Sequence, residues 1–307
     1  MVPRPRSIQI AALLLFLGAW TEGCSIRRIA INNLSDALAA SGSTFASDDD
    51  PELIRDALPF ALKLMESLLE ENPRHKGLLT AAAGGFTQYG YAFVQQDADE
   101  IEDKDLDAAI ALRDRARRLY LRARDYGLRG LDASHPGFAS DLRKNPGAAV
   151  KLAKAADVPL LYWTAVPWSA AISISKSDAD MVGDLPIVDA LIDRALGLDE
   201  SYDNGAIHSF LITYEMGRPG AAGDPAARAR NHFERAMELA GGMQASPLVA
   251  LAESVSVYEQ DKAEFESLLR RALAIDPDAR PARRLSNLIF QRRARWLVGR
   301  TDRLILE

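Results

Sequence analysis

Three stretches in the C-terminal half of the sequence repeat one helical pattern, and this repeat restricts the fold more than any other feature. The segments RALGLDES, RAMELAGG and RALAIDPD begin at Arg194, Arg235 and Arg271, which gives spacings of 41 and 36 residues. Each segment ends one helical pattern and is followed, after a short break, by another. A period of roughly 34 residues is typical of tetratricopeptide-like helical pairs. Such pairs stack into a solenoid, so we expect an all-α fold with a concave binding face.

The predicted pairs cover residues 187–216, 229–260 and 263–297. Alanine and leucine dominate the whole sequence and β-branched runs are scarce, which favours helices elsewhere as well. The stretch DDDPE at residues 48–52 has the features of a helix start, because acidic side chains and a first-turn proline suit exposed N–H groups. We therefore predict degenerate tetratricopeptide-like helical pairs over residues 51–307, packed as a compact α-solenoid.

The first 24 residues differ from the rest and predict export. Arg4 and Arg6 precede the apolar run IQIAALLLFLGA at residues 8–19. This pattern is typical of a signal peptide and is short for a permanent membrane anchor. Cys24, the sole cysteine, follows a glycine, as in the lipobox of a bacterial lipoprotein. We expect residues 1–23 to be a signal peptide and Cys24 to be lipidated; the alternative is a plain secretory signal that leaves Cys24 incidental.

Residues 24–50 are interpreted as a lipidated tether and lead-in to the helical domain. Without residues 1–23 the chain would carry 35 basic and 42 acidic side chains, a net charge of −7, which argues against a general nucleic-acid binder. No cysteine would remain for a disulfide, so the domain would depend on its core alone. Ser25 gives no inner-membrane retention signal of the aspartate kind, which favours an outer-membrane anchor that faces the periplasm.

The helical period resumes at Leu53, with two predicted interruptions. Pro59 should kink or split the first helix, and Asn72 with Pro73 should end it. A second helix is predicted over LLTAAAGGFTQYGYAFVQQ, residues 78–96. The next stretch, residues 97–107, holds seven acidic side chains and one lysine, which predicts a solvated loop.

Arginines gather in two later regions. Residues 108–129 form a predicted helix with seven arginines from Arg113 onward, and residues 270–303 carry ten. For the first region we expect a solvated face that pairs with nearby acids, with an anion-facing or partner-facing surface as the alternative. The second region could also dock an acidic partner or lipid headgroups.

No motif in the sequence supports catalysis or metal binding. The glycines of GGFTQYG, residues 84–90, lie inside a helical pattern and form no phosphate loop. The four histidines are far apart and lack metal-ligand spacing, and no serine lies in a nucleophile elbow. His208 is interpreted as a satisfied core histidine, with a hydrogen bond to a ligand in a cavity as the alternative. We expect no enzyme, no cofactor and no metal site.

The stretch VPLLYWTAVPWSAAISI, residues 158–174, holds no charge, two tryptophans and two prolines. We predict a helix from near Pro159 that is interrupted or kinked at Pro167. Its aromatic side chains should face inward, either as plain core packing or as the lining of a ligand cavity; a trimer interface is a third use. The candidates for a cavity lining are Phe86, Tyr89, Tyr91, Phe93, Tyr162, Trp163, Trp168 and His208.

Five stretches, in this order, together resemble a known family. They are DDDPELIRDALPFALKLMESLL, GFTQYGYAFVQ, RARRLYLRARDYGLRGL, VPLLYWTAVPWSAAIS and GAIHSFLITYE. They are similar to stretches of the T component of TRAP transporters, a family of tetratricopeptide-like bacterial lipoproteins. The resemblance runs from about residue 24 to the C-terminus, while Thr21 and Glu22 depart from the usual lipobox.

The resemblance implies a binding role. T components are described as trimers with a channel or cavity through each protomer. They pair with the periplasmic substrate-binding protein of a TRAP system, which imports small organic acids or other, including hydrophobic, ligands. By resemblance this chain would form a homotrimer, dock that protein and accept its ligand in an internal cavity. Two other classes stay open: a tetratricopeptide scaffold lipoprotein of envelope or pilus assembly that binds an extended peptide and, least favoured, an enzyme.

Overall fold

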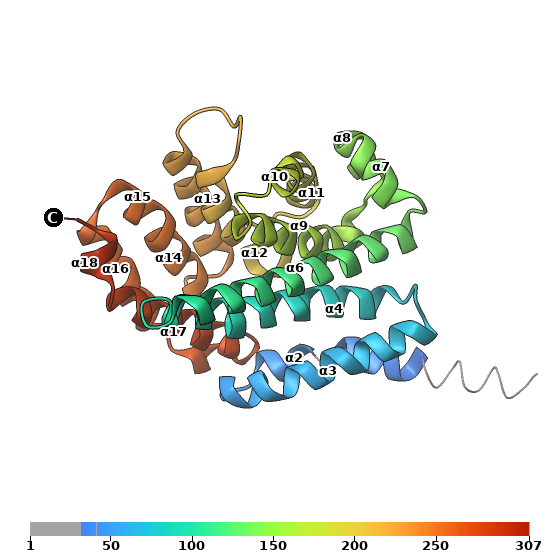
Figure 1. Ribbon diagram of the computed structural model, residues 1–307, viewed down its shortest axis with the longest axis horizontal. Coiled ribbons are helices and arrows are strands. Elements are labelled where there is room, and N and C mark those ends of the chain that lie inside the picture. The colour runs from blue at the N-terminus through green and yellow to red at the C-terminus, as the bar shows by residue number, and fades with distance from the viewer. Residues whose placement is uncertain (1–31, 41, 307) are drawn as a thin grey trace, which may run out of the picture.

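The computed structural model describes residues 32–40 and 42–306, and this part of the chain folds into helices, with no strand (Figure 1). The predicted all-α class is therefore confirmed. The predicted signal peptide, residues 1–23, and the predicted lipidation site, Cys24, lie outside the described residues. None of the described helices is both long and apolar enough to cross a membrane.

The N-terminal part begins with a helix over residues 32–40, followed by α2 (Gly42–Ala46), α3 (Pro51–Glu71) and α4 (Lys76–Tyr89). Helix α3 begins as predicted, because the Asp50 carboxylate accepts hydrogen bonds of 3.0 Å from the backbone N–H groups of both Glu52 and Leu53. Pro59 was predicted to kink or split this helix, and α3 runs through it without a split. The buried apolar face of α3 packs on α4, and this tertiary packing outweighs the hydrogen bond lost at Pro59.

Helix α4 continues without a break into the π-helical segment η1 (Gly90–Gln95) and α5 (Gln96–Ile101). The loop predicted over residues 97–107 is therefore wrong for its first part, which is helical. Its acidic side chains are not simply solvated, because arginines from α3, from the next helix and from the C-terminal part pair with them. These partners are far away in the sequence, so local charge alone could not reveal them.

Helix α6 (Leu106–Ser134) crosses the middle of the molecule and packs closely on α9 (Val158–Ser173). Gly127 permits this contact: a Cβ there would lie 3.1 Å from the backbone Cα of Thr164. Helix α9 was predicted to be interrupted or kinked at Pro167, and it runs through this residue without an interruption. Its lack of charge fits its surroundings, because it packs against α4, α6 and α11 (Leu185–Leu198). Short helices connect α6 to α9: α7 (Phe138–Lys144), α8 (Pro146–Ala149), η2 (Val150–Leu152) and η3 (Ala155–Asp157).

The three helical pairs predicted in the C-terminal half are confirmed. They are α11 (Leu185–Leu198) with α12 (Tyr202–Tyr214), α13 (Pro225–Leu239) with α14 (Ala245–Leu251), and α16 (Lys262–Leu273) with α17 (Arg284–Val298). The remaining elements are α10 (Ala179–Gly183), η4 (Glu215–Gly217), η5 (Ala252–Ser256), α15 (Val257–Glu259), η6 (Pro277–Ala279), η7 (Pro281–Arg283) and α18 (Thr301–Leu304). Successive pairs share apolar contacts, which is how a solenoid of this kind builds a continuous core.

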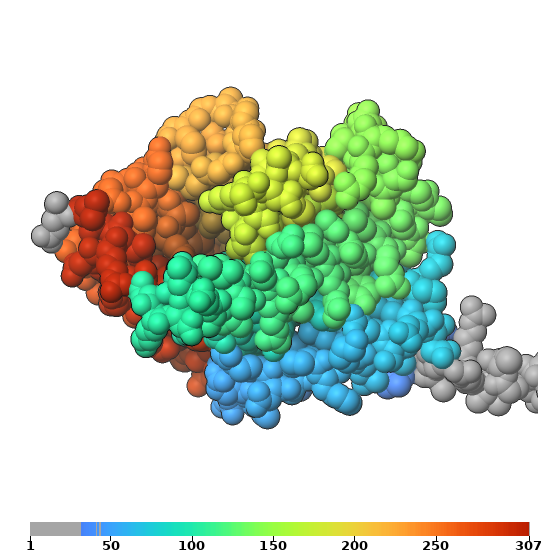
Figure 2. Space-filling view, viewed as in Figure 1, coloured from blue at the N-terminus to red at the C-terminus, as the bar shows by residue number. Residues whose placement is uncertain are grey.

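The C-terminal end returns to the N-terminal end, so the stack of helices closes on itself. Helix α17 contacts both α2 and α3, and in Figure 1 it lies beside the N-terminal helices. In the space-filling view the C-terminal helices lie directly against the start of α6 (Figure 2). This closure surrounds an interior space, which is the candidate site.

Candidate functional site

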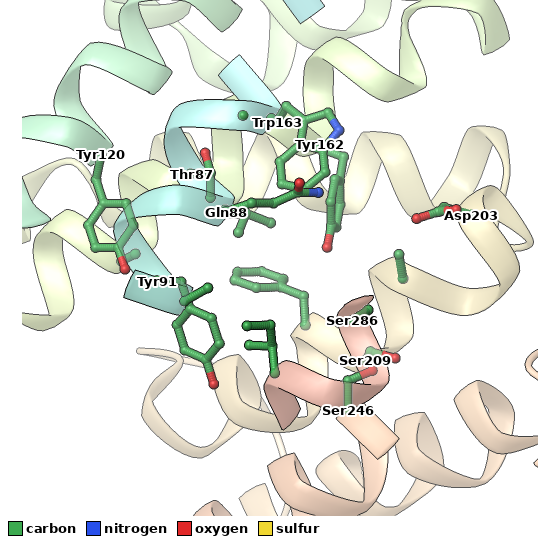
Figure 3. Close-up of a pocket in the computed structure, with 18 of the residues that line it drawn as sticks. Thr87, Gln88, Tyr91, Tyr120, Tyr162, Trp163, Asp203, Ser209, Ser246 and Ser286 are labelled. Atoms are coloured by element: carbon green, nitrogen blue, oxygen red, sulfur yellow. The ribbon is translucent and has the colours of Figure 1, made fainter. Parts of the chain in front are cut away.

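A cavity of about 2010 Å³, partly open to solvent, lies between the helices of the stack. Side chains from α3, α4, η1, α9, α12, α14 and α17 line it, and Figure 3 shows part of this lining. Much of the wall is apolar: α3 contributes Ile54, Leu58, Leu62 and Met65. Pockets for drug-sized ligands measure roughly 300–1,000 Å³. The space is therefore large enough for a long apolar chain.

Four of the predicted aromatic residues line the cavity: Tyr91, Phe93, Tyr162 and Trp163. The first two lie on the π-helical segment η1 and the other two on α9. The Trp163 indole lies against Gly84 of α4, where a Cβ would be 3.1 Å from the ring. The rings of Tyr162 and Trp163 are 4.8 Å apart in an edge-on arrangement. Close contact between α4 and α9 thus places two neighbouring aromatic rings on the wall.

The other four predicted residues do not line the cavity. Phe86 stacks on Tyr126 with ring centroids 5.8 Å apart, and the Arg115 guanidinium lies 5.8 Å from the centre of the Tyr89 ring. Both side chains point from α4 toward α6 rather than into the cavity. The helix period explains the division, since only one face of α4 can meet the cavity.

Trp168 is fully buried in the core between helices. Its indole N–H donates to the Asp184 carboxylate at 3.2 Å, and the Arg124 and Arg143 guanidinium groups lie 5.0 and 5.6 Å from its ring. The apolar stretch at residues 158–174 therefore has two uses: Tyr162 and Trp163 face the cavity, and Trp168 fills the core.

His208 is also away from the cavity lining, at the contact between α12 and α13. Its Nδ1 lies 2.9 Å from Nδ1 of His232, and its Nε2 lies 3.3 Å from the Glu200 carboxylate. Burial lowers the pKa of His208, although the Glu200 carboxylate opposes that effect. Its polar atoms thus have protein partners, so they are occupied without any ligand.

The first turn of α12 is a strained part of the cavity wall. Asp203, Asn204 and Gly205 have φ values of 48°, 56° and 87°, and left-handed backbone is unfavourable for residues other than glycine. Arg283 holds this turn: its guanidinium group pairs with the Asp203 carboxylate and donates to the Asp203 carbonyl at 3.1 Å. The side chains of Asp203 and Arg283 both line the cavity. The Arg283–Asp203 ion pair therefore connects the start of α17 to the start of α12.

A second set of ion pairs connects α17 to an acidic cluster. We define this acidic cluster as Asp97, Asp99, Glu100, Glu102 and Asp103. Arg292 pairs with Asp97 at 2.7 Å and with Glu100 at 2.8 Å. Arg293 pairs with Asp99 at 2.9 Å. Burial alone would raise the pKa of Asp97, but hydrogen bonds from Arg55 and Arg292 lower it below the ordinary value.

This cluster limits the predicted docking role of the arginines in residues 270–303. Arg300 and Arg303 both pair with Asp103, while Arg283 and Arg284 pair with Asp203 and Asp278. Many of these arginines therefore bind the protein's own carboxylates. The same holds for Arg113 in the other arginine-rich region, as expected there, because it pairs with Asp99 and Glu102.

Sequence reasoning missed several residues of the cavity wall. Gln88 lines the cavity and lies one turn beyond Gly84 and Gly85 on α4. A polar side chain beside these small residues could have indicated that this face of the helix borders a cavity. Ile289 and Phe290 of α17 line the cavity as well. No signal in the sequence could place them there, because that depends on how the stack closes.

Among the described residues, no group of three or more histidine, cysteine or acidic side chains is arranged to hold a metal ion. An all-α stack of helical pairs around a large, mostly apolar cavity defines a class of helical-repeat proteins suited to binding.

The comparison with known families gives a specific assignment. Residues 47–305 match the family described as TRAP transporter T-component, and the chain belongs to this family. It is also similar to an uncharacterised protein of Treponema pallidum (strain Nichols), with 29% identity over 305 residues, which covers 93% of this chain and 94% of the relative. Membership associates the protein with TRAP transport and with the cell envelope, and the family is not a known enzyme family.

Proposed function

We propose that this protein is a periplasm-facing lipoprotein that docks the substrate-binding protein of a TRAP system and accepts its small organic or hydrophobic ligand. The observation that carries the proposal is the interior cavity of about 2010 Å³, with its largely apolar wall, in a member of the T-component family. A wall of this kind suits apolar ligands because their transfer from water is favourable.

The proposal includes the location and assembly of the protein. Residues 1–23 would act as a signal peptide, and acyl chains on Cys24 would hold the protein at a membrane, preferably the outer one. Residues 24–50 would lead from that anchor into the helical domain over residues 51–307. The protein would work as a homotrimer without a cofactor or catalytic residue.

Native mass spectrometry tests the proposal directly. The full chain would be measured alone and after mixing with the TRAP substrate-binding protein of the same genome. We expect a trimer that takes up the binding protein, together with a co-purified small mass that is lost when Trp163→Ala alters the cavity wall. A monomer that ignores the binding protein would contradict the proposal and would favour a tetratricopeptide scaffold of envelope assembly.

A further inference from the structure

The cavity wall carries a ring of uncharged polar groups. Five helices contribute such side chains, and from each we select one: Gln88 on α4, Tyr162 on α9, Ser209 on α12, Ser246 on α14 and Ser286 on α17. In Figure 3 Gln88 and Tyr162 lie near each other, and Ser209, Ser246 and Ser286 form a second group. We call this set the polar belt. Because its members come from different helices, one ligand group could meet several of them at once.

The protein leaves hydrogen-bonding capacity unused at this level. The Ser209 hydroxyl is buried and has no partner among the described residues. Gln244, two residues before Ser246, also lines the cavity; it is 7% exposed, and its amide nitrogen has no partner among the same residues. An unsatisfied buried polar group costs about 1–3 kcal/mol. Neighbouring protein atoms cover both groups in this structure, so a ligand group would satisfy them only after the two side chains turn toward the cavity.

The lining holds four cationic side chains, and two of them pair with carboxylates of the protein. Arg283 is paired with Asp203, and Lys76 lies 3.4 Å from the Asp157 carboxylate. Arg280 donates to the Ala240 carbonyl at 3.4 Å. Arg280 and Lys176 have no carboxylate partner among the described residues, and Lys176 is exposed.

A carboxylate is a poor fit for the belt. Burial, followed by the Asp203 charge, raises the pKa of Tyr162, so the Asp203 carboxylate acts on the Tyr162 hydroxyl. A ligand carboxylate at that hydroxyl would meet the same negative charge. None of the five belt side chains is cationic, so a carboxylate held by them alone would leave water without an opposite charge beside it, which is costly. An uncharged hydroxyl or amide avoids both penalties.

We propose that the polar belt, together with Gln244, binds the uncharged hydroxyl-bearing or amide-bearing end of an amphiphile whose apolar chain lies against the α3 wall. The inference rests on the proposed role of the cavity as a ligand site and names the chemical class of its ligand. It selects a neutral glycerol-type headgroup over a fatty-acid carboxylate.

The test compares two probes with the same acyl chain, 1-monooleoylglycerol and oleate, binding to the full chain at about pH 8. Binding is followed by tryptophan fluorescence, because Trp163 lies on the wall. We expect 1-monooleoylglycerol to bind at least about tenfold more tightly, since one or two hydrogen bonds contribute about 1 kcal/mol each. Tyr162→Phe and Gln88→Leu should each reduce this preference by about fivefold.

Tyr258→Phe is the matched control, because Tyr258 is 68% exposed and lies outside the cavity lining; it should leave the preference unchanged. Equal or tighter binding of oleate overturns the inference while the cavity keeps its proposed role. A preference that survives both belt substitutions also overturns it. If neither probe binds, the inference and the proposed ligand role of the cavity both fail.

Discussion

The imidazole rings of His208 and His232 meet through their Nδ1 atoms, which lie 2.9 Å apart. One of these nitrogens must donate and the other must accept, so a proton on both would place two N–H groups against each other. The arrangement that also satisfies Glu200 has His208 donating from Nε2 and His232 donating from Nδ1. This pair, which joins α12 to α13, is therefore stable while both rings are neutral.

The pair predicts a loss of stability in acid. Burial lowers the pKa of His208 and of His232 from 6.5. Below pH 6.5 the unfolded chain binds protons that the folded chain does not, so the free energy of unfolding should fall as pH decreases. The loss is at most about 1.4 kcal/mol per pH unit for each histidine. Urea unfolding at several pH values should show a shallower dependence for His232→Gln; an unchanged dependence would contradict the prediction.

The close contact between α6 and α9 predicts a strong effect at Gly127. A Cβ there would meet the Thr164 side chain and lie 3.1 Å from its backbone Cα, so Gly127→Ala should force the helices apart. We expect a loss of about 1–3 kcal/mol in the free energy of unfolding, measured by urea denaturation. Gly197→Ala in α11, where no atom lies within 4 Å of the new Cβ, should be neutral or stabilising by up to about 1 kcal/mol. Equal effects at both positions would argue against this packing.

Arg293 should matter far more than the other arginines near the C-terminus. Its side chain is 9% exposed and pairs with Asp99 and Glu253. Removing it would leave two partly buried carboxylates without that partner, so Arg293→Met should lower the free energy of unfolding by about 3 kcal/mol. Arg303 is 63% exposed, and Arg303→Met should cost about 0.5 kcal/mol or less. Thermal unfolding of the two variants measures this difference in stability. Equal losses would mean that the buried ion pairs of Arg293 do not hold α17 in place.

The left-handed turn at the start of α12 predicts different results for two small replacements. Asn204 has φ of 56°, a conformation that glycine adopts freely and alanine resists. Asn204→Ala should therefore destabilise the protein by about 1 kcal/mol, whereas Asn204→Gly should be close to neutral. Chemical denaturation of both variants measures this difference. If alanine were tolerated as well as glycine, the turn would not be strained.

Local sequence patterns predicted most of the individual helices. The repeats at Arg194, Arg235 and Arg271 lie in the observed pairs, and Asp50 with Pro51 starts α3. These signals act within one or two helical turns, so they can be read from neighbouring residues. The split that Pro59 could cause does not occur, because tertiary packing of α3 offsets the local penalty.

The site was less predictable because it depends on how distant segments meet. Tyr162 and Trp163 were found through an unusual uncharged stretch, but nothing in that stretch separates their cavity side from the core position of Trp168. The acidic stretch from Asp97 likewise looked solvated, since its partner Arg292 is almost two hundred residues away. Both the cavity-facing position of Tyr162 and Trp163 and the pairing of Asp97 depend on how the C-terminal helices return to the N-terminal ones.

The two tryptophans of α9 provide a test that separates the core from the cavity wall. Trp168 is fully buried and hydrogen-bonded to Asp184, so Trp168→Ala should lower the free energy of unfolding by about 3–5 kcal/mol. Trp163 borders a space that already exists, so Trp163→Ala adds to that space instead of creating a new void and should cost about half as much. Urea denaturation gives both values. A larger loss for Trp163→Ala would mean that its indole supports the core more than the cavity wall, and the proposed ligand site would then have to depend on Tyr162 and the polar belt.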